Sequence, residues 1–124
     1  MWKRMSVLFL MTLWIVSNPA PAAVTADNGG VCPQALPTDS PAFCESFVSV
    51  ARCHCIASGM SKIFCQNVGF IYKTMIALYG SVENACAHQH DTDAQNCIDD
   101  WHCYRSGGSD SAGRLCSGTG KACA

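Results

Sequence analysis

The sequence predicts a small all-α domain stapled by disulfide bonds. Ten cysteines in a chain of 124 residues that begins like an exported protein are typical of a disulfide framework. Apolar residues recur at helical spacing between recognisable helix start and stop signals. No segment shows the apolar-polar alternation that marks a strand. We therefore expect an antiparallel helical hairpin, two shorter helices and irregular ends that cysteines hold in place.

Residues 1–22 have the organisation of a secretory signal peptide. Lys3 and Arg4 precede the apolar run VLFLMTLWIV, and small residues follow, so that cleavage is expected just after Ala22. The run is shorter than the roughly 20 residues that cross a bilayer. We expect no stable membrane insertion after cleavage, and a single disulfide-rich α domain over residues 23–124.

Cysteine content and charge limit the compartment and the partners. All ten cysteines lie beyond the expected cleavage site, which predicts an oxidising compartment. Because the chain has no Asn-x-Ser/Thr sequon, we favour the bacterial periplasm, with secretion as the alternative. Removing Lys3 and Arg4 leaves six basic residues against nine acidic ones, a formal charge of −3. Since Lys and Arg do not cluster, nucleic acid and anionic membrane are disfavoured as direct partners.

The first helix is predicted between two clear signals. An irregular arm, residues 23–37, is tied down by Cys32 and precedes it. Ser40 suits the N-cap and Pro41 the first helical position, because the missing proline N–H would have no partner there anyway. Gly59 is the expected stop. One face carries the residues at helical spacing, namely Cys44, Phe47, Val48, Ala51 and Cys55.

A second helix is predicted from an N-cap at Ser61 to about Tyr79, with Gly80 at its end. Its apolar stripe follows the spacing i, i+4, i+7, i+11, i+14. The stripe consists of Phe64, Val68, Ile71, Met75 and Leu78. The connection Ser58-Gly59-Met60-Ser61 would make the two helices an antiparallel hairpin.

Two shorter helices and a tail complete the chain. The third helix is expected from Ser81 to about His90. Thr92 and Gln95 form a capping box for the fourth, which Gly107-Gly108 ends. Its predicted core residues are Cys97, Ile98, Trp101 and Tyr104. The Gly- and Ser-rich tail can be ordered only if Cys116 and Cys123 pin it.

The disulfide framework comprises Cys32, Cys44, Cys53, Cys55, Cys65, Cys86, Cys97, Cys103, Cys116 and Cys123. Helix geometry puts Cys53 and Cys55 on different sides, so they should serve different neighbours. A bridge from Cys65 to Cys55 or to Cys53 would close the hairpin, and we favour Cys55–Cys65.

Cys44 should pair elsewhere, with a later cysteine such as Cys86 or Cys97. Eleven residues of helix, the separation of Cys44 from Cys55, span about 16 Å, and a bridge needs Cα atoms within about 7 Å. Cys44 therefore lies too far from the bend to reach Cys65.

Cys53-His54-Cys55 has two interpretations. A neighbouring imidazolium lowers the pKa of a thiol, which would favour a redox-active dithiol. The alternative is two structural half-cystines that flank an exposed histidine, and the dense cysteine framework favours this second interpretation.

His88-Gln89-His90-Asp91 resembles a metal site only superficially. Two histidines at this spacing project about 200° apart on a helix, and no further ligand follows at a known spacing. We interpret the segment as a turn between helices, and we expect no metal or cofactor.

No catalytic motif is apparent. The chain lacks G-x-S-x-G and H-E-x-x-H, and Asp99, Asp100 and His102 lack the adjacent-cysteine CCxxHD pattern of secreted phospholipases. Trp101 and Tyr104 are expected in the core. We therefore predict a protein that is not an enzyme, with no catalytic residue.

Three pieces carry a family resemblance: CHC at Cys53–Cys55, CIDDWHCYRSGG at Cys97–Gly108 and CSGTGKAC at Cys116–Cys123. In these pieces the chain resembles small exported cysteine-rich proteins encoded in the transfer regions of conjugative plasmids. It is most similar to the KikA type, which is sometimes grouped with TrbM proteins. The resemblance implies a periplasmic accessory of plasmid conjugation that is linked to the killing of some recipient cells.

Three functions therefore compete. The leading hypothesis is an accessory protein that contacts envelope or secretion-system proteins in conjugation or type IV secretion. The second is an envelope-active toxin or lytic factor, since lipid-perturbing proteins also use stapled helical hairpins with apolar stripes. The third is a thiol-disulfide enzyme that uses Cys53 and Cys55.

Overall fold

The computed structural model describes residues 32–89 and 92–124, so the expected signal peptide lies outside the described residues. This part of the chain is helical and contains no strand, as predicted. The elements are α1 (Phe43–Ala57), α2 (Lys62–Cys65), α3 (Val68–Tyr79), α4 (Val82–Ala87), α5 (Ala94–Arg105) and a 3-10 turn, η1 (Cys116–Gly118). Within the described residues, no helix has the length and apolar character needed to cross a membrane.

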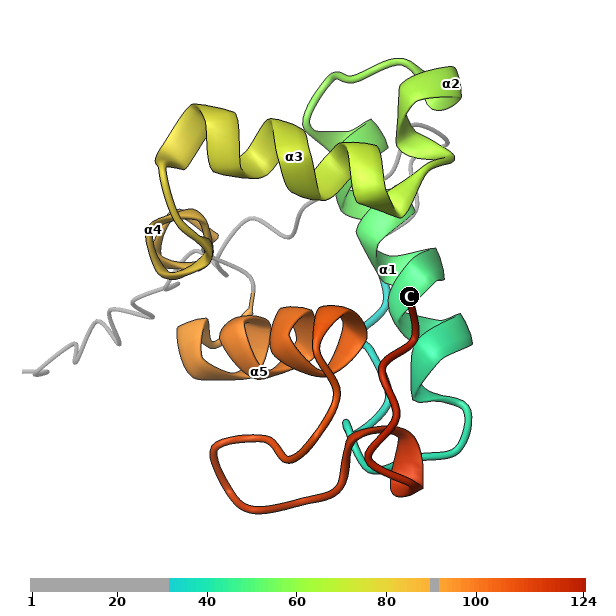
Figure 1. The fold of residues 1–124 in the computed structure, drawn as a ribbon. Coiled ribbons are helices and arrows are strands. Elements are labelled where there is room, and N and C mark those ends of the chain that lie inside the picture. Colours follow the sequence, from blue (N-terminus) through green and yellow to red (C-terminus); the bar gives the residue numbers. More distant parts are fainter. Residues whose placement is uncertain (1–31, 90–91) are drawn as a thin grey trace, which may run out of the picture.

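Four helices form a frame. In Figure 1, α3 and α5 both extend sideways from α1, one near each end of it, and α4 joins their far ends. Contacts link α1 to both α3 and α5, and α4 to the same two helices. The C-terminal segment returns alongside α1 (Figure 1). The frame places side chains from all four helices around a common interior.

The core lies where α1 meets α5. Phe43 is fully buried, and the Phe47 ring meets the Trp101 ring edge to face, with centroids 4.8 Å apart. Tyr104 and Tyr72 also contact Trp101, at centroid distances of 6.4 and 5.6 Å. Such aromatic pairs add about 0.5–1.5 kcal/mol each to the free energy gained by burial. Trp101 is thus held in one position by three rings.

Five disulfides staple this frame: Cys32–Cys53, Cys44–Cys123, Cys55–Cys65, Cys86–Cys97 and Cys103–Cys116. The predicted Cys55–Cys65 bridge is confirmed, and Cys53 and Cys55 do serve different neighbours. Both tail cysteines are anchored, as expected. Because such bridges persist only under oxidising conditions, they indicate an extracytoplasmic compartment.

Cys44 pairs with a later cysteine and not with Cys65, as predicted, but the two candidates named for it, Cys86 and Cys97, were wrong. Cys44 pairs with Cys123, whereas Cys86 and Cys97 pair with each other across the α4–α5 connection. The tail turns back along α1, where the Cys123 N–H donates to the Tyr104 carbonyl at 2.9 Å. This path brings the chain end next to the start of α1 and leaves α4 and α5 to staple each other.

The second predicted helix is divided in two. α2 ends at Cys65, and α3 begins after Asn67, whose side chain accepts a hydrogen bond from the Phe70 N–H at 3.0 Å. Asn67 has extended backbone angles and acts as a new N-cap. Arg52 of α1 donates to the freed Gln66 carbonyl at 2.8 Å. The predicted stripe is accordingly interrupted: Val68 is buried, but Phe64 and Leu78 are exposed.

Two helix starts also differ from the predictions. α1 begins at Phe43, because Ser40 and Pro41 form a turn in which the Ser40 carbonyl accepts from the Phe43 N–H at 3.0 Å. α5 is capped by Asp93 rather than Thr92, and the Asp93 side chain accepts from the Asn96 N–H at 3.1 Å. Asp93 lies closer to the first free amides, and a carboxylate is favoured there by the helix dipole.

The other boundaries agree more closely with the sequence. α3 ends at Tyr79, and Gly80 adopts the left-handed conformation that favours glycine, as predicted. α4 follows its N-cap Ser81, the residue at which the third helix was predicted to start, but it ends at Ala87, about three residues before the predicted end. The predicted end, His90, lies outside the described residues.

Buried carboxylates order the tail together with its disulfides. Asp110 accepts from the Thr38 hydroxyl and from the Arg114 guanidinium, each at 2.7 Å. Asp99 accepts from the Ser111 hydroxyl at 2.6 Å, which ties the tail to α5. The disulfides of Cys116 and Cys123, which were predicted to pin the tail, therefore act together with these hydrogen bonds.

Candidate functional site

Cys53-His54-Cys55 contains no free thiol. Cys53 is bonded to Cys32 and Cys55 to Cys65, and all ten cysteines, which lie in the described part of the chain, are paired. The two neighbouring sulfurs belong to separate bridges, so they do not form a dithiol pair with each other. His54 lies between them and lines a cavity.

The segment with two histidines is only partly described, because His90 and Asp91 lie outside the described residues. In the described ranges, no three His, Cys, Asp or Glu side chains are grouped so that they could hold a metal ion. His88 instead contacts Tyr79, with ring centroids 4.7 Å apart, and its Nδ1 lies 2.7 Å from the Asn84 carbonyl oxygen.

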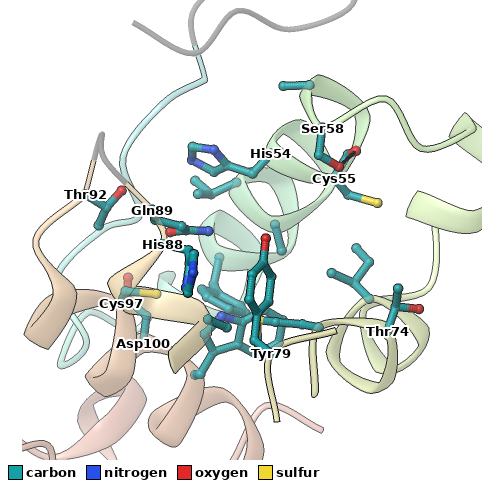
Figure 2. A pocket seen from close by; sticks show the side chains of 18 of the residues that line it. His54, Cys55, Ser58, Thr74, Tyr79, His88, Gln89, Thr92, Cys97 and Asp100 are labelled. Atoms are coloured by element: carbon teal, nitrogen blue, oxygen red, sulfur yellow. Dashed lines mark hydrogen bonds between the residues drawn. The ribbon is translucent and has the colours of Figure 1, made fainter. Parts of the chain in front are cut away.

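The candidate site is a cavity of about 550 Å³ inside the four-helix frame. This volume is within the range of about 300–1,000 Å³ that small-ligand sites occupy. Side chains of α1, α3, α4 and α5 line the cavity, and Figure 2 shows the labelled ones converging on it. We call it the central pocket.

Most of the pocket wall is apolar. α1 contributes Phe47 and Ala51, α3 contributes Ile71 and Met75, and α5 contributes Trp101. Phe47, Ala51 and Trp101 also belong to the buried core, so this wall is rigid. An apolar group that entered the pocket would therefore meet a preformed surface.

Polar side chains interrupt this wall at several points and come from every side of the frame. They are His54, Ser58, Thr74, Tyr79, His88, Gln89, Thr92 and Asp100 (Figure 2). A few polar groups in an otherwise apolar wall are what fixes the orientation of a bound ligand.

The hydrogen bond of His88 determines what this side chain offers. A carbonyl oxygen only accepts, so Nδ1 of His88 must donate to the Asn84 carbonyl. In the neutral ring, Nε2 then carries the lone pair and can accept a hydrogen bond from a ligand N–H or O–H. The Tyr79 ring, tilted by 33° against the imidazole, contacts it and helps to hold it in place.

Asp100 is the titratable group with the most unusual environment in the pocket. Burial raises its pKa, and the neighbouring Asp99 carboxylate raises it further, to about 7, although Arg114 partly opposes the shift. Below that pH the group is a neutral carboxylic acid that can donate a hydrogen bond to a carbonyl or another acceptor. A cationic ligand would instead favour its ionised form.

Sequence reasoning did not identify this pocket. His54, His88 and Asp100 were each considered in other roles, and Trp101 was assigned to the core, which is only part of its position. Nothing in their spacing relates them, because they lie on three different helices or helix ends. Only the crossing of α3 and α5 over α1 brings them together.

Comparisons with protein-family models, with curated proteins and with solved structures find no match for this chain. The KikA-type resemblance therefore stays a prediction.

Proposed function

We propose that this chain is an exported accessory protein of the bacterial envelope that works by binding a partner protein in the periplasm. The observation that carries the proposal is the central pocket, a preformed apolar cavity with hydrogen-bonding groups. The paired cysteines also favour a binding protein over a thiol-disulfide enzyme, since Cys53 and Cys55 belong to different bridges.

The pocket suits an apolar side chain, or a short apolar segment, of the partner. Trp101, Phe47 and Met75 would surround the apolar group. A partner backbone that enters with this group brings both N–H donors and C=O acceptors, which must be paired once they are buried. Nε2 of His88 can accept from an N–H, and protonated Asp100 can donate to a carbonyl.

We infer the cellular role from the resemblance to KikA-type proteins: support of plasmid conjugation or of a type IV secretion system. Five disulfides are compatible with a periplasmic site of action. A small stapled domain is suited to this role, because it can present a fixed binding site outside the cytoplasm without a large core.

A transfer assay tests the role and the pocket together. The gene is deleted from the donor's transfer region, and the deletion is complemented with the wild type or with Thr74→Arg, which places a long cation in the pocket wall. Ser49→Arg is the matched control, because Ser49 is an exposed α1 residue that does not line the pocket. Absence of free thiols in denaturant shows that every cysteine of each variant is paired, and a circular dichroism spectrum like that of the wild type shows that the variant has folded.

Deletion should lower the frequency of plasmid transfer, and both the wild type and Ser49→Arg should restore it. Oxidised Thr74→Arg should not. Unchanged transfer after deletion would contradict the cellular role. Full restoration by Thr74→Arg would contradict the role of the pocket.

A further inference from the structure

Apolar side chains are unusually exposed on α2 and on the outer side of α3. The exposed fractions are 80% for Ile63, 52% for Phe64, 41% for Phe70 and 71% for Leu78. The Phe64 and Phe70 rings stack on each other, with centroids 5.3 Å apart, which joins α2 and α3 into one surface. Because Leu78 lies about 140° around α3 from Lys73 and lines the central pocket, we leave it out and call Ile63, Phe64, Phe70 and Lys73 the α2–α3 face.

The face has a helical basis. Phe70, Lys73 and Ala77 follow one another at i, i+3 and i+7 and are all exposed, so they form one side of α3. The opposite side carries Val68, which is buried in the core. The side of α3 that is not packed against the domain thus carries Phe70 beside Lys73, and together with Ile63 and Phe64 of α2 it leaves apolar surface exposed of the kind that marks an interaction site.

The segment of the chain that forms the face carries only positive charges among its Lys, Arg, Asp and Glu residues. Residues 46–82 contain three charged side chains of the Lys, Arg, Asp and Glu types, namely Arg52, Lys62 and Lys73, and no acid. Arg52 lies at the face, because its guanidinium donates to the Gln66 carbonyl between α2 and α3. Lys73 lies within it.

The acidic residues of the described chain lie elsewhere. Six of the seven belong to the segments around the start of α1, to α5 and to the tail, and Glu83 starts α4. Figure 1 shows α2 and α3 at the end of the molecule opposite to α5 and the η1 turn. Although the net charge of the whole chain is negative, the end formed by α2 and α3 is basic and apolar, and the opposite end is acidic.

We propose that the α2–α3 face docks on the surface of an anionic phospholipid bilayer. Aliphatic and phenyl side chains enter the boundary between headgroups and acyl chains, and lysine and arginine remain beside the phosphates. Ile63, which is 80% exposed, projects from the four-residue helix α2, and a deformable bilayer accepts such an apolar tip without a matching groove. A protein partner would need a groove of complementary shape, and for that reason we favour the bilayer.

This docking differs from insertion, since none of the described helices can span a membrane. It is also distinct from the proposed function, because Ile63, Phe64 and Lys73 do not line the central pocket. Phe70 and Leu78 do border the central pocket, so docking would bring the edge of the pocket close to the lipid surface.

Vesicle sedimentation with the purified exported protein tests the proposal. The probes are vesicles of phosphatidylethanolamine mixed with phosphatidylglycerol and vesicles of phosphatidylcholine alone. Ile63→Ser/Phe64→Ser removes the apolar tip, and Leu36→Ser/Leu115→Ser is the matched control, because both leucines are exposed but lie outside the face, at 44% and 51%. Lys73→Glu tests the charge, with Lys121→Glu on the tail as its control.

We expect binding to vesicles that contain phosphatidylglycerol, weakened by added salt and much weaker on phosphatidylcholine. The double tip variant should bind at least about tenfold more weakly, and Lys73→Glu roughly tenfold more weakly, while both controls bind like the wild type. Thiol titration in denaturant confirms that every variant keeps its bridges.

Two results would overturn the proposal. One is the absence of binding to the anionic vesicles, or binding that both tip and control variants retain equally. The other is a concentration-dependent dimer, in the absence of lipid binding, that Ile63→Ser/Phe64→Ser dissociates, since the face would then be a contact between two copies. Failure of the transfer assay alone would leave the lipid result unchanged, so the two proposals fail separately.

Discussion

Replacing Asp100 with asparagine should make the protein more stable at neutral pH and remove part of its pH dependence. The folded chain holds the proton of Asp100 up to a pKa of about 7, whereas the unfolded chain releases it near the ordinary value of 3.8. Between these two pH values the folded state binds more protons than the unfolded state. Stability contributed by Asp100 is therefore fully present below about pH 4 and is lost as the pH rises to about 7.

The size of the effect follows from the two pKa values. Their difference corresponds to at most about 4 kcal/mol, because each pKa unit is worth about 1.4 kcal/mol. The Asp100 side chain is only partly buried, so solvent screens the charge and we expect about half of this, roughly 2 kcal/mol. Asparagine keeps the shape of the side chain but carries no charge at any pH, so it avoids the cost of burying a carboxylate.

Urea unfolding of the oxidised protein at a series of pH values from 4 to 8 is the assay. Wild type should lose roughly 2 kcal/mol more than Asp100→Asn across this range, and the variant should be the more stable protein at the upper end. Asp39→Asn, which neutralises an exposed carboxylate, is the control and should keep the wild-type slope. If Asp100→Asn and wild type have parallel pH profiles, Asp100 is not a buried acid and the account of the pocket's hydrogen bonding is wrong.

Three further predictions concern the scaffold, each measured by urea unfolding. Cys44→Ser/Cys123→Ser should lower the free energy of unfolding by about 4 kcal/mol and Cys55→Ser/Cys65→Ser by about 3 kcal/mol. The bridged cysteines are 79 and 10 residues apart, and a bridge that closes a longer loop removes more entropy from the unfolded chain. Equal losses would contradict this dependence on loop length. Gly107→Ala should lower the free energy of unfolding by more than about 2 kcal/mol, because its Cβ would lie 2.5 Å from the Ala122 nitrogen. Gly113→Ala, also at positive φ but with no atom near the new Cβ, should lower it by about 1 kcal/mol. Similar losses in the two variants would exclude the close contact at Gly107. Although burial opposes ionisation of Asp110, hydrogen bonds from Thr38, Arg114 and the Ala112 backbone lower its pKa to about 2. The stability that ionised Asp110 contributes should therefore be present above about pH 4 and disappear toward pH 2. Asp110→Asn should be less stable than the wild type at neutral pH, and its free energy of unfolding should change less with pH in that acid range. An unchanged acid profile in that variant would show that Asp110 does not hold the tail.

The sequence was most informative where structure depends on neighbours in the chain. Gly80 ends α3 because a left-handed residue is needed there, and Cys55 pairs with Cys65 because a hairpin bend brings them together. The break between α2 and α3 was also readable in principle, since Asn67 is a good N-cap. The apolar stripe outweighed that signal in the prediction, although the stripe does not continue through the break.

Features that depend on the path of distant segments could not be predicted. Cys44 pairs with Cys123 only because the tail turns back along α1, and no local pattern specifies that return. The central pocket has the same origin: Asp100, His88 and His54 meet because α3 and α5 leave α1 at separate levels. The raised pKa of Asp100 follows from this burial, so the sequence alone could not indicate it.

The disulfides and the two proposed binding surfaces have a common physical basis. A domain of this size buries a limited apolar surface, and here the core is built around Phe43, Phe47 and Trp101. A hollow of about 550 Å³ and the exposed side of α3 contribute little packing energy. Five covalent bridges offset this deficit by reducing the entropy of the unfolded chain. Because the bridges reduce the need for a large core, apolar side chains such as Ile63 and Phe64 can stay outside it, and the same bridges are stable in an oxidising, extracytoplasmic compartment.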